Sequence, residues 1–364
     1  MSRWIDRRVL DLLAIEVPIL QAPMAGATTP EMAIAARRAG GLGGLPCAQY
    51  SIEEARAAVA RYRSEVAGPV NLNFFSHVAP APDPVAALAW RARLAPYYVE
   101  RGLDPAPIPP VAGRAPFDEG FCALVEEIRP EVVSFHFGLP ARPLLDRVRA
   151  TGAKILSSAT TVAEAVWLEA EGVDAVIAMG LEAGGHRGNF LDVSDDDPAM
   201  IRAMAAQVGL FALLPQVADA VRVPVIAAGG IADGRGIAAA LALGASAAQI
   251  GTAYLFTPEA KVPAAHRAAL EAARDDNTMV TNLFTGRPAR GVANRLMLEQ
   301  GPLSPAVPAF PQAGGALVPL RDGGASPDFT NLWSGQSARL APRGLDAETL
   351  TRRLAEQALE AMGR

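Results

Sequence analysis

The chain has 364 residues, of which 51% are hydrophobic and 20% are charged, and its formal net charge is −5. This composition excludes a disordered chain, and the length predicts one large globular domain with a smaller part appended to it. Because the chain has no long run of lysine or arginine, we expect no nucleic-acid partner and infer that its partners are small molecules.

The cysteines and the N-terminal residues bear on the cellular location of the protein. Cys47 and Cys122 are too few for a disulfide framework and have no metal-like spacing, so we expect two reduced, buried thiols. Residues 1–11 contain three arginines but no apolar segment of the kind that a secretory signal needs. No stretch approaches the roughly 18 apolar residues of a membrane span. The sequence therefore predicts a cytoplasmic protein without a membrane partner, present as a monomer or homodimer.

Short apolar segments alternate with alanine-rich helical segments along the first 250 residues, a pattern typical of repeated βα units. The segments are mostly continuously apolar, as expected for parallel strands that are covered on both faces. Eight repeats favour a closed (β/α)8 TIM barrel in the α/β class, since an open doubly wound sheet more usually has five or six strands. The predicted strands are 18–22, 41–45, 69–73, 132–137, 154–158, 175–179, 224–228 and 247–251.

Helices are expected between these strands. Ser51 with Glu54, and Thr161 with Glu164, have the spacing of a capping box at two of the predicted helix starts. The predicted helices are 30–39, 51–63, 119–127, 142–150, 161–169, 198–207 and 234–243.

Two segments interrupt the repeats and predict the division of the chain. Residues 77–116 are rich in proline around a helical segment at 85–101, which indicates an elaborated βα loop over the active-site face of the barrel. After the last strand the pattern becomes irregular, and helical spacing returns at 328–340 and 346–362. We therefore expect a barrel over 1–256, a small lid domain over 257–325, and C-terminal helices over 326–364 that close on the barrel.

Glycine-rich turns follow the last two predicted strands. Gly229 and Gly230 come after Ala228, and Gly251 with Thr252 ends the next strand. Adjacent glycines allow close backbone approach, and N–H groups at a helix start favour an anion, so a phosphate site is predicted here. The alternative is that these glycines only make tight turns. The glycine-rich segment 40–44 fits a dinucleotide fingerprint poorly, because it precedes and includes its strand instead of following it.

One histidine stands at a predicted strand end. His186 follows the sixth strand in a glycine-rich loop, where it has no helix face to pack on, and this position in a barrel favours a catalytic role. His77 also follows a strand and is a secondary candidate. His136 is expected within a strand and His266 in a surface helix, and neither has a metal-ligand spacing with a carboxylate or cysteine, so no metal site is predicted.

Five motifs in order resemble the nitronate monooxygenase family, formerly called 2-nitropropane dioxygenases. They are Gln21–Gly26 (QAPMAG), Asn71–Phe75 (NLNFF), Ser157–Thr161 (SSATT), Glu182–Gly188 (EAGGHRG) and Ala228–Gly234 (AGGIADG). Residues 94–98 and 284–291 are similar to its class I branch, and the resemblance covers about residues 15 to 340. It implies an FMN-dependent enzyme that oxidises alkyl nitronates, and nitroalkanes if a base is present, with O2 to a carbonyl compound and nitrite.

The resemblance also implies a role for each matching position. His186 would lie above the flavin and face the substrate. Met179 stands where family members often have a glutamine, and Phe310 where they usually have a tyrosine, so the flavin contacts and the substrate are expected to differ. The implied cofactor-binding residues are Ala22, Pro23, Met24, Asn73, Ser157, Met179, Gly184, Gly185, Ala228, Gly229, Gly230, Gln249, Gly251 and Thr252.

Two other functions remain open at this point. The first is an NAD(P)H-dependent FMN reductase of quinones or enoyl thioesters, which would use the same phosphate site. The second is a flavin-free barrel lyase or isomerase that acts on a phosphorylated metabolite.

Overall fold

The computed structural model describes residues 4–105, 115–191 and 197–363. Eight parallel strands form one sheet in the order β1-β9-β8-β6-β5-β4-β3-β2, and a parallel bridge between Leu20 and Leu42 joins its two edges. The predicted (β/α)8 barrel and all eight predicted strands are confirmed. The strands are β1 (Ile19–Gln21), β2 (Gly43–Pro46), β3 (Val70–Phe75), β4 (Val132–His136), β5 (Lys154–Ala159), β6 (Ala175–Met179), β8 (Val225–Ala228) and β9 (Ala247–Ile250).

Helices pack around the barrel in places that the sequence predicts. At the start of α3 the capping box is complete, because Ser51 Oγ accepts from the Glu54 N–H and the Glu54 carboxylate accepts from the Ser51 N–H. At Thr161 only half of the box forms, since the Glu164 carboxylate accepts instead from the N–H groups of Thr160 and Phe190. These helices are α2 (Pro30–Arg38), α3 (Ile52–Glu65), α5 (Glu119–Ile128), α6 (Arg142–Ala150), α7 (Val162–Ala170) and α10 (Gly234–Ala242).

The helix that covers β6 and β8 was not predicted. Helix α8 (Asp197–Ala205) confirms the predicted helix 198–207, but α9 (Leu210–Ala220) is the helix that packs against both strands and against α7. The apolar spacing of α9 is helical, with Leu210, Leu213, Leu214 and Val217 buried, and Pro215 lies inside the helix. The short helix α1 (Arg8–Leu13) was also missed.

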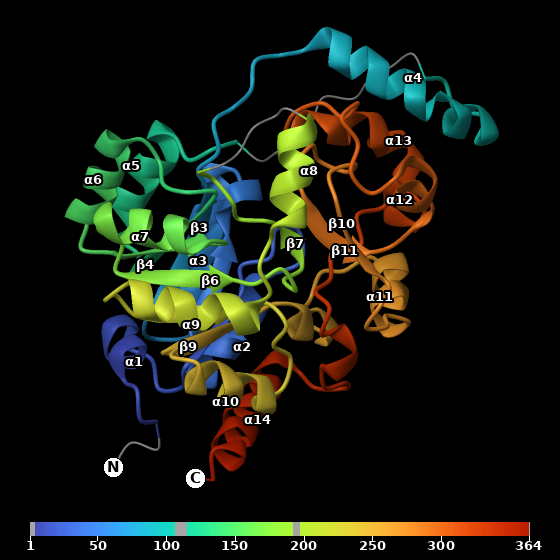
Figure 1. The fold of residues 1–364 in the computed structure, drawn as a ribbon. Helices are drawn as coiled ribbons and strands as arrows, with labels where there is room; N and C mark the ends of the chain where they lie inside the picture. The colour runs from blue at the N-terminus through green and yellow to red at the C-terminus, as the bar shows by residue number, and fades with distance from the viewer. Residues whose placement is uncertain (1–3, 106–114, 192–196, 364) are drawn as a thin grey trace.

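A second apolar core lies beside the barrel. Helix α4 (Pro84–Glu100), predicted as 85–101, buries Trp90, Leu94, Tyr97 and Tyr98 against α12 (Arg295–Gln300), η3 (Gln312–Leu317) and α13 (Val318–Arg321). The Tyr98 hydroxyl donates to the Ala316 carbonyl at 2.6 Å. In Figure 1 α4 accordingly lies against the orange helices of the C-terminal part, away from the barrel helices. Residues from 77–116 and from 257–325 thus share one core.

Three antiparallel strands connect this second core to the barrel. They are β7 (Gly185–His186), β11 (Ala289–Val292) and β10 (Thr278–Thr281), and none was predicted. The predicted helix at 328–340 is wrong, because Trp333 forms an antiparallel bridge with Gly291 and only the turn η5 (Ala338–Leu340) is helical.

The C-terminal helix α14 (Ala347–Ala361), predicted as 346–362, packs against α10 and α2, and α11 (Ala264–Glu271) is the helix in which His266 was expected. Within residues 4–105, 115–191 and 197–363, no helix is long and apolar enough to span a bilayer.

Candidate active site

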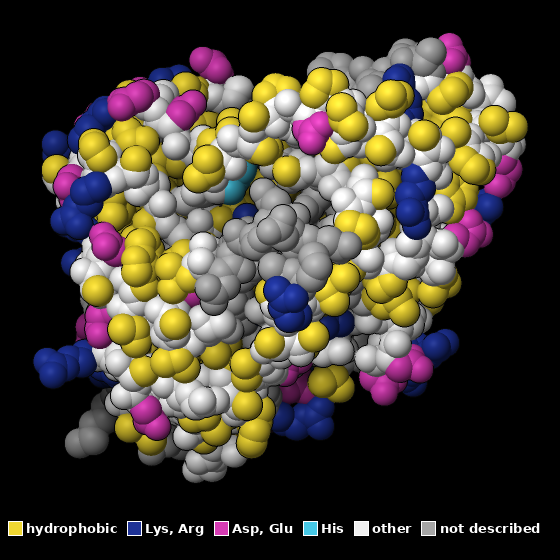
Figure 2. Space-filling model, turned by 45° about the horizontal axis from the view of Figure 1, so that its top comes forward, with side chains coloured by type: hydrophobic (Ala, Val, Ile, Leu, Met, Phe, Trp, Pro, Cys, Tyr) yellow, Lys and Arg dark blue, Asp and Glu magenta, His cyan; other side chains and the backbone are white. Residues whose placement is uncertain are grey.

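A cavity of about 440 Å³ lies where the barrel strands end, a size usual for small-molecule and cofactor sites. The view in Figure 2 shows a hollow in which a histidine side chain is visible, with cationic and anionic side chains both scattered over the surrounding face. Every predicted site residue except Ser157 lines the cavity. Those that do are Ala22, Pro23, Met24, Asn73, Met179, Gly184, Gly185, His186, Ala228, Gly229, Gly230, Gln249, Gly251 and Thr252.

The strand pleat explains why Ser157 is excluded. Side chains alternate between the two faces of a strand, so neighbours cannot both face the barrel interior. Ser158 lines the cavity, whereas the Ser157 hydroxyl donates to the carbonyls of Phe135 and Gly138. The same alternation brings Ser134 and His136 of β4 to the cavity together.

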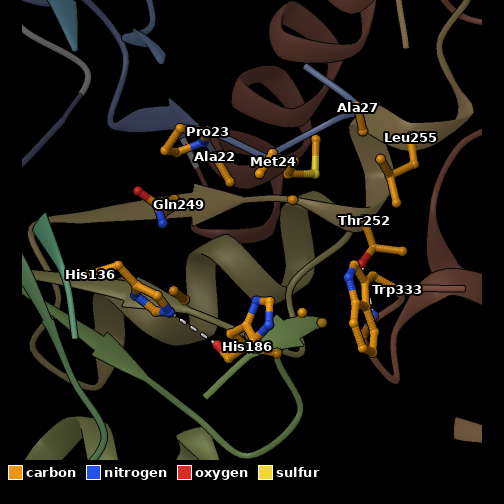
Figure 3. Close-up of a pocket in the computed structure, with 18 of the residues that line it drawn as sticks. Ala22, Pro23, Met24, Ala27, His136, His186, Gln249, Thr252, Leu255 and Trp333 are labelled. Carbon is orange, nitrogen blue, oxygen red and sulfur yellow. Dashed lines mark hydrogen bonds between the residues drawn. The ribbon is translucent and has the colours of Figure 1, made fainter. Parts of the chain in front are cut away.

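The segment Ala22–Met24 is held in place by polar side chains on either side of it. Gln21 Oε1 accepts from the Gly44 N–H at 3.0 Å, which ties β1 to β2. Thr28 Oγ1 accepts from the Met24 N–H at 3.0 Å and from Gln21 Nε2 at 3.1 Å. The turn after β1 is therefore a fixed wall of the cavity, as Figure 3 shows for Ala22, Pro23 and Met24.

The glycine turn after β8 has the backbone that only glycine adopts readily. Gly229 and Gly230 have φ of 101° and 71°, and a Cβ at Gly229 would lie 2.9 Å from the Ala183 nitrogen. The start of the following helix lies outside the cavity lining. The N-terminus of α10 is capped by the Asp233 carboxylate, which accepts from the Gly236 N–H, and neither residue lines the cavity. The cavity therefore borders the turn, and the expected role of the helix start in binding an anion stays a prediction.

The turn after β9 is tied to the segment that closes the cavity. Thr252 Oγ1 accepts from the Gly335 N–H at 2.9 Å, which leaves its own hydroxyl hydrogen available for a ligand. Sequence reasoning missed this segment because it was predicted as a helix, and Trp333, Gly335 and Ser337 all line the cavity.

His186 lies in β7, where it pairs with Ala289 of β11, so it is not in the irregular loop that the glycines suggested. Its Nε2 is 3.0 Å from Thr285 Oγ1. The Thr285 hydroxyl also lies 3.3 Å from the Arg287 carbonyl, and when it donates to that carbonyl it accepts from Nε2–H, which leaves the lone pair of the neutral ring on Nδ1. Four aromatic rings have centroids between 5.3 and 6.2 Å from that of His186, those of Phe310, Trp333, Phe137 and Phe75.

Arg187, the next residue, is fully buried and braces the end of β6. Its guanidinium donates to the carbonyls of Met179 and Gly180 and to Gln207 Oε1. Burial, with repulsion from Arg290, lowers the pKa of Arg187 to about 10, so the group stays charged near neutral pH. This arginine fixes the backbone that leads into β7.

Two of the other three histidines also line the cavity. His136 lies within a strand as predicted and also lines the cavity. His266 was expected on a surface helix, but it is buried, lines the cavity and donates from Nε2 to the Trp333 carbonyl. His77, the secondary candidate, is buried among aromatic rings and does not line the cavity.

Two features of the cavity wall fit a flat, polar cofactor. Gln249 Oε1 is buried and has no hydrogen-bond partner among the described residues, so it is an acceptor that a ligand could satisfy. Gly185 has a φ of 73°, and no described atom lies within 4 Å of where its Cβ would be. A flat ring could therefore approach the backbone at Gly185 closely.

Only one of the two departures from the family pattern lines the cavity. Met179 is part of the lining, whereas Phe310 is not and packs its ring against His186. Cys47 and Cys122 are free and buried, as expected.

Two sequence relatives and one solved structure match this chain over nearly its whole length. A nitronate monooxygenase from Pseudomonas aeruginosa is 40% identical over 96% of this chain and 98% of its own, and one from Paraburkholderia phytofirmans is 41% identical over 96% and 94%. A crystal structure of nitroalkane oxidase from Streptomyces ansochromogenes has a TM-score of 0.85 and 39% identity, covering 98% of this chain and 99% of that one. The family model for nitronate monooxygenase matches residues 6–357. With the barrel and its histidine-containing cavity, these matches show that the chain belongs to the nitronate monooxygenase family.

Proposed function

We propose that the chain binds FMN in this cavity and oxidises alkyl nitronates with O2 to a carbonyl compound and nitrite. The observation that carries the proposal is that His186 and two glycine turns, from strands β8 and β9, line one cavity. Bound FMN would supply the electron-transfer chemistry, which no amino-acid side chain provides. The small-molecule substrate and O2 are therefore the partners that matter.

The phosphate of FMN would lie at the Gly229–Gly230 and Gly251–Thr252 turns. Backbone N–H groups in such turns, with the Thr252 hydroxyl, offer charge-assisted hydrogen bonds that favour an anion. Ala22–Met24 and the backbone at Gly185 would flank the ring, and the unpartnered Gln249 acceptor would receive a hydrogen bond from it. Asn73, whose amide donates to the Ser134 hydroxyl at 2.9 Å, supports the same wall.

His186 would handle the proton and hold the substrate. With Nε2–H directed at Thr285, Nδ1 of the neutral ring is the basic nitrogen and can take the α-proton of a nitroalkane. The protonated ring can donate to a nitronate oxygen instead. The aromatic rings around His186 present apolar surface to its imidazole, and a less polar surrounding strengthens either interaction.

A nitrite-release assay with several nitronates, run with and without oxygen, tests this proposal. We expect nitrite and carbonyl product in air and little turnover without oxygen. Anaerobic mixing with NADH supplies the contrast: rapid loss of the flavin absorbance, together with no nitrite in air, would support a flavin reductase and overturn the proposal. A protein that is colourless and cannot be reconstituted with FMN would favour the flavin-free lyase or isomerase.

We also propose that α4 and residues 257–325 act together as the lid of the barrel. The shared core of these two segments and the contact between β11 and β7 support this division. A lid built in this way would act directly on the backbone of His186.

A further inference from the structure

We propose that His136 is a positioning residue for His186: its imidazole, oriented by the Ser158 hydroxyl, holds the backbone carbonyl of His186 and so determines where the His186 ring enters the cavity. Its effect on turnover rests on the proposed function. The hydrogen-bond arrangement itself can be tested without substrate.

The hydrogen bonds of His136 define a single tautomer. Its Nε2 lies 3.1 Å from the His186 carbonyl oxygen, and a carbonyl can only accept, so Nε2 carries the hydrogen. Its Nδ1 lies 2.7 Å from Ser158 Oγ. In the neutral ring Nδ1 must accept, and the Ser158 hydroxyl therefore donates to it. The result is a directed chain from Ser158 through His136 to the His186 backbone, whose last hydrogen bond is drawn in Figure 3.

The chain segment after His186 comes very close to this pair. A Cβ at Gly188 would lie 2.7 Å from Ser158 Oγ and 3.0 Å from His136 Cε1, so only glycine fits there without displacing the pair. On its other side, β7 pairs with β11, where His186 faces Ala289. The His186 peptide is thus held from the barrel by His136 and from the second core by β11.

The surroundings keep His136 neutral. Removal from bulk water, with repulsion from the guanidinium groups of Arg287 and Arg187, lowers the pKa of His136 to about 3, and the hydrogen bond to the His186 carbonyl opposes this only in part. A ring that stays neutral keeps Nδ1 as an acceptor for Ser158 at neutral and mildly acidic pH. The hydrogen bonds from Ser158 through His136 to the His186 carbonyl therefore keep the same direction over that range.

Histidine NMR on the full-length protein, with and without FMN, tests the tautomer directly. The chain has four histidines, so ¹⁵N-histidine labelling gives four imidazole spectra, and the signal absent from His136→Gln identifies His136. We expect the Nε2–H tautomer and no titration between pH 5 and 8. An Nδ1–H tautomer, or a titration near pH 6, would overturn the proposal whatever the protein catalyses.

Kinetics on two conservative variants test the positioning role. Glutamine can place an N–H where Nε2–H lies, whereas asparagine is too short to reach the His186 carbonyl. We therefore expect His136→Asn to lower kcat by about tenfold to a hundredfold with little change in KM or FMN content, because small displacements of a reacting group have effects of this size. His136→Gln should recover most of the loss. Equal activity of both variants and the wild type would contradict the role.

Ser158→Ala completes the test, because it removes only the hydroxyl that orients His136. Its effect on kcat should largely disappear in the His136→Asn background, as expected for residues that act through one another. Tyr62→Phe is the matched control: it removes a buried hydrogen bond to the Pro69 carbonyl, outside the cavity. Tyr62→Phe should lower the melting temperature without changing kcat. Fully additive effects of Ser158→Ala and His136→Asn would overturn the proposal that Ser158 acts through His136. If no nitronate is turned over but the NMR result holds, the proposed function fails and the positioning of His186 by His136 stands.

Discussion

The Nε2 atom of His186 lies 3.0 Å from the hydroxyl oxygen of Thr285, a residue that follows it by 99 positions and lies outside the barrel. The barrel supplies the cavity, but a residue outside the barrel holds the ring of its central histidine. When the Thr285 hydroxyl donates to the Arg287 carbonyl, it accepts from Nε2–H and the basic lone pair of His186 is on Nδ1.

Replacing this histidine tests its chemical role. We expect His186→Asn to retain its yellow cofactor and to lose turnover by about 10² to 10⁴-fold, the usual worth of a general base or of a positioned donor. The measurement is nitrite release per bound FMN, with the flavin spectrum as the control for an intact cavity. Near wild-type turnover would contradict a direct role for the imidazole.

Replacing Gln249 should have opposite effects on the stability of the FMN-free protein and on FMN binding. Its Oε1 is buried without a partner among the described residues, which costs about 1–3 kcal/mol in the FMN-free protein. We therefore expect Gln249→Leu to raise the melting temperature of the FMN-free protein while it weakens FMN binding. Thermal unfolding with and without FMN measures both effects. A variant that destabilises the FMN-free protein, or binds FMN as tightly as the wild type, would show that this acceptor does not await the cofactor.

His77 predicts an acid sensitivity of the fold. Burial, with repulsion from Arg287, lowers the pKa of His77 to about 4, and neither ring nitrogen has a partner in the described ranges. Between about pH 6.5 and 4 the unfolded chain binds a proton that the folded protein does not, so stability is full above this window and falls as the pH decreases through it. The loss from this group is on the order of 3 kcal/mol.

His77→Leu should reduce this acid sensitivity. Part of the slope should remain, because the pKa of His136 is also lowered. Urea unfolding at pH 7.5 and pH 4.5 measures the difference for both proteins. An unchanged pH dependence in the variant would mean that His77 is protonated in the folded protein.

The barrel could be predicted from the sequence because each strand is covered on both faces and therefore appears as a short apolar segment between turn residues. This pattern does not show which residues of a strand face the cavity. Because both faces of β5 are buried, the sequence does not distinguish Ser157 from Ser158, and the predicted residue, Ser157, is the one that points away from the cavity. Helix α9 contains Pro215, a residue that is uncommon inside helices and weakens the helical pattern of this segment.

The second core could not be derived from local patterns. Segments far apart in the chain share it, as when Tyr98 donates to the Ala316 carbonyl. The same holds for Trp333, whose segment has helical apolar spacing but forms a strand-like contact with β11. His136 and His266 were set aside because a strand or helix position by itself does not show which cavity it faces, and tertiary packing decides that.

Location and assembly stay predictions. A cytoplasmic protein that is a monomer or homodimer is expected from the sequence, and size-exclusion chromatography with light scattering would measure the oligomeric state.

The two turns at the ends of β8 and β9 are proposed to bind the phosphate of a flavin mononucleotide. Fluorescence titration of the flavin-free protein with FMN and with riboflavin, which lacks the phosphate, tests this proposal most directly. We expect FMN to bind at least about a hundredfold more tightly, since two or more charge-assisted hydrogen bonds would be lost with the phosphate, and we expect Thr252→Val to reduce that ratio. Equal dissociation constants for the two flavins would contradict the claim.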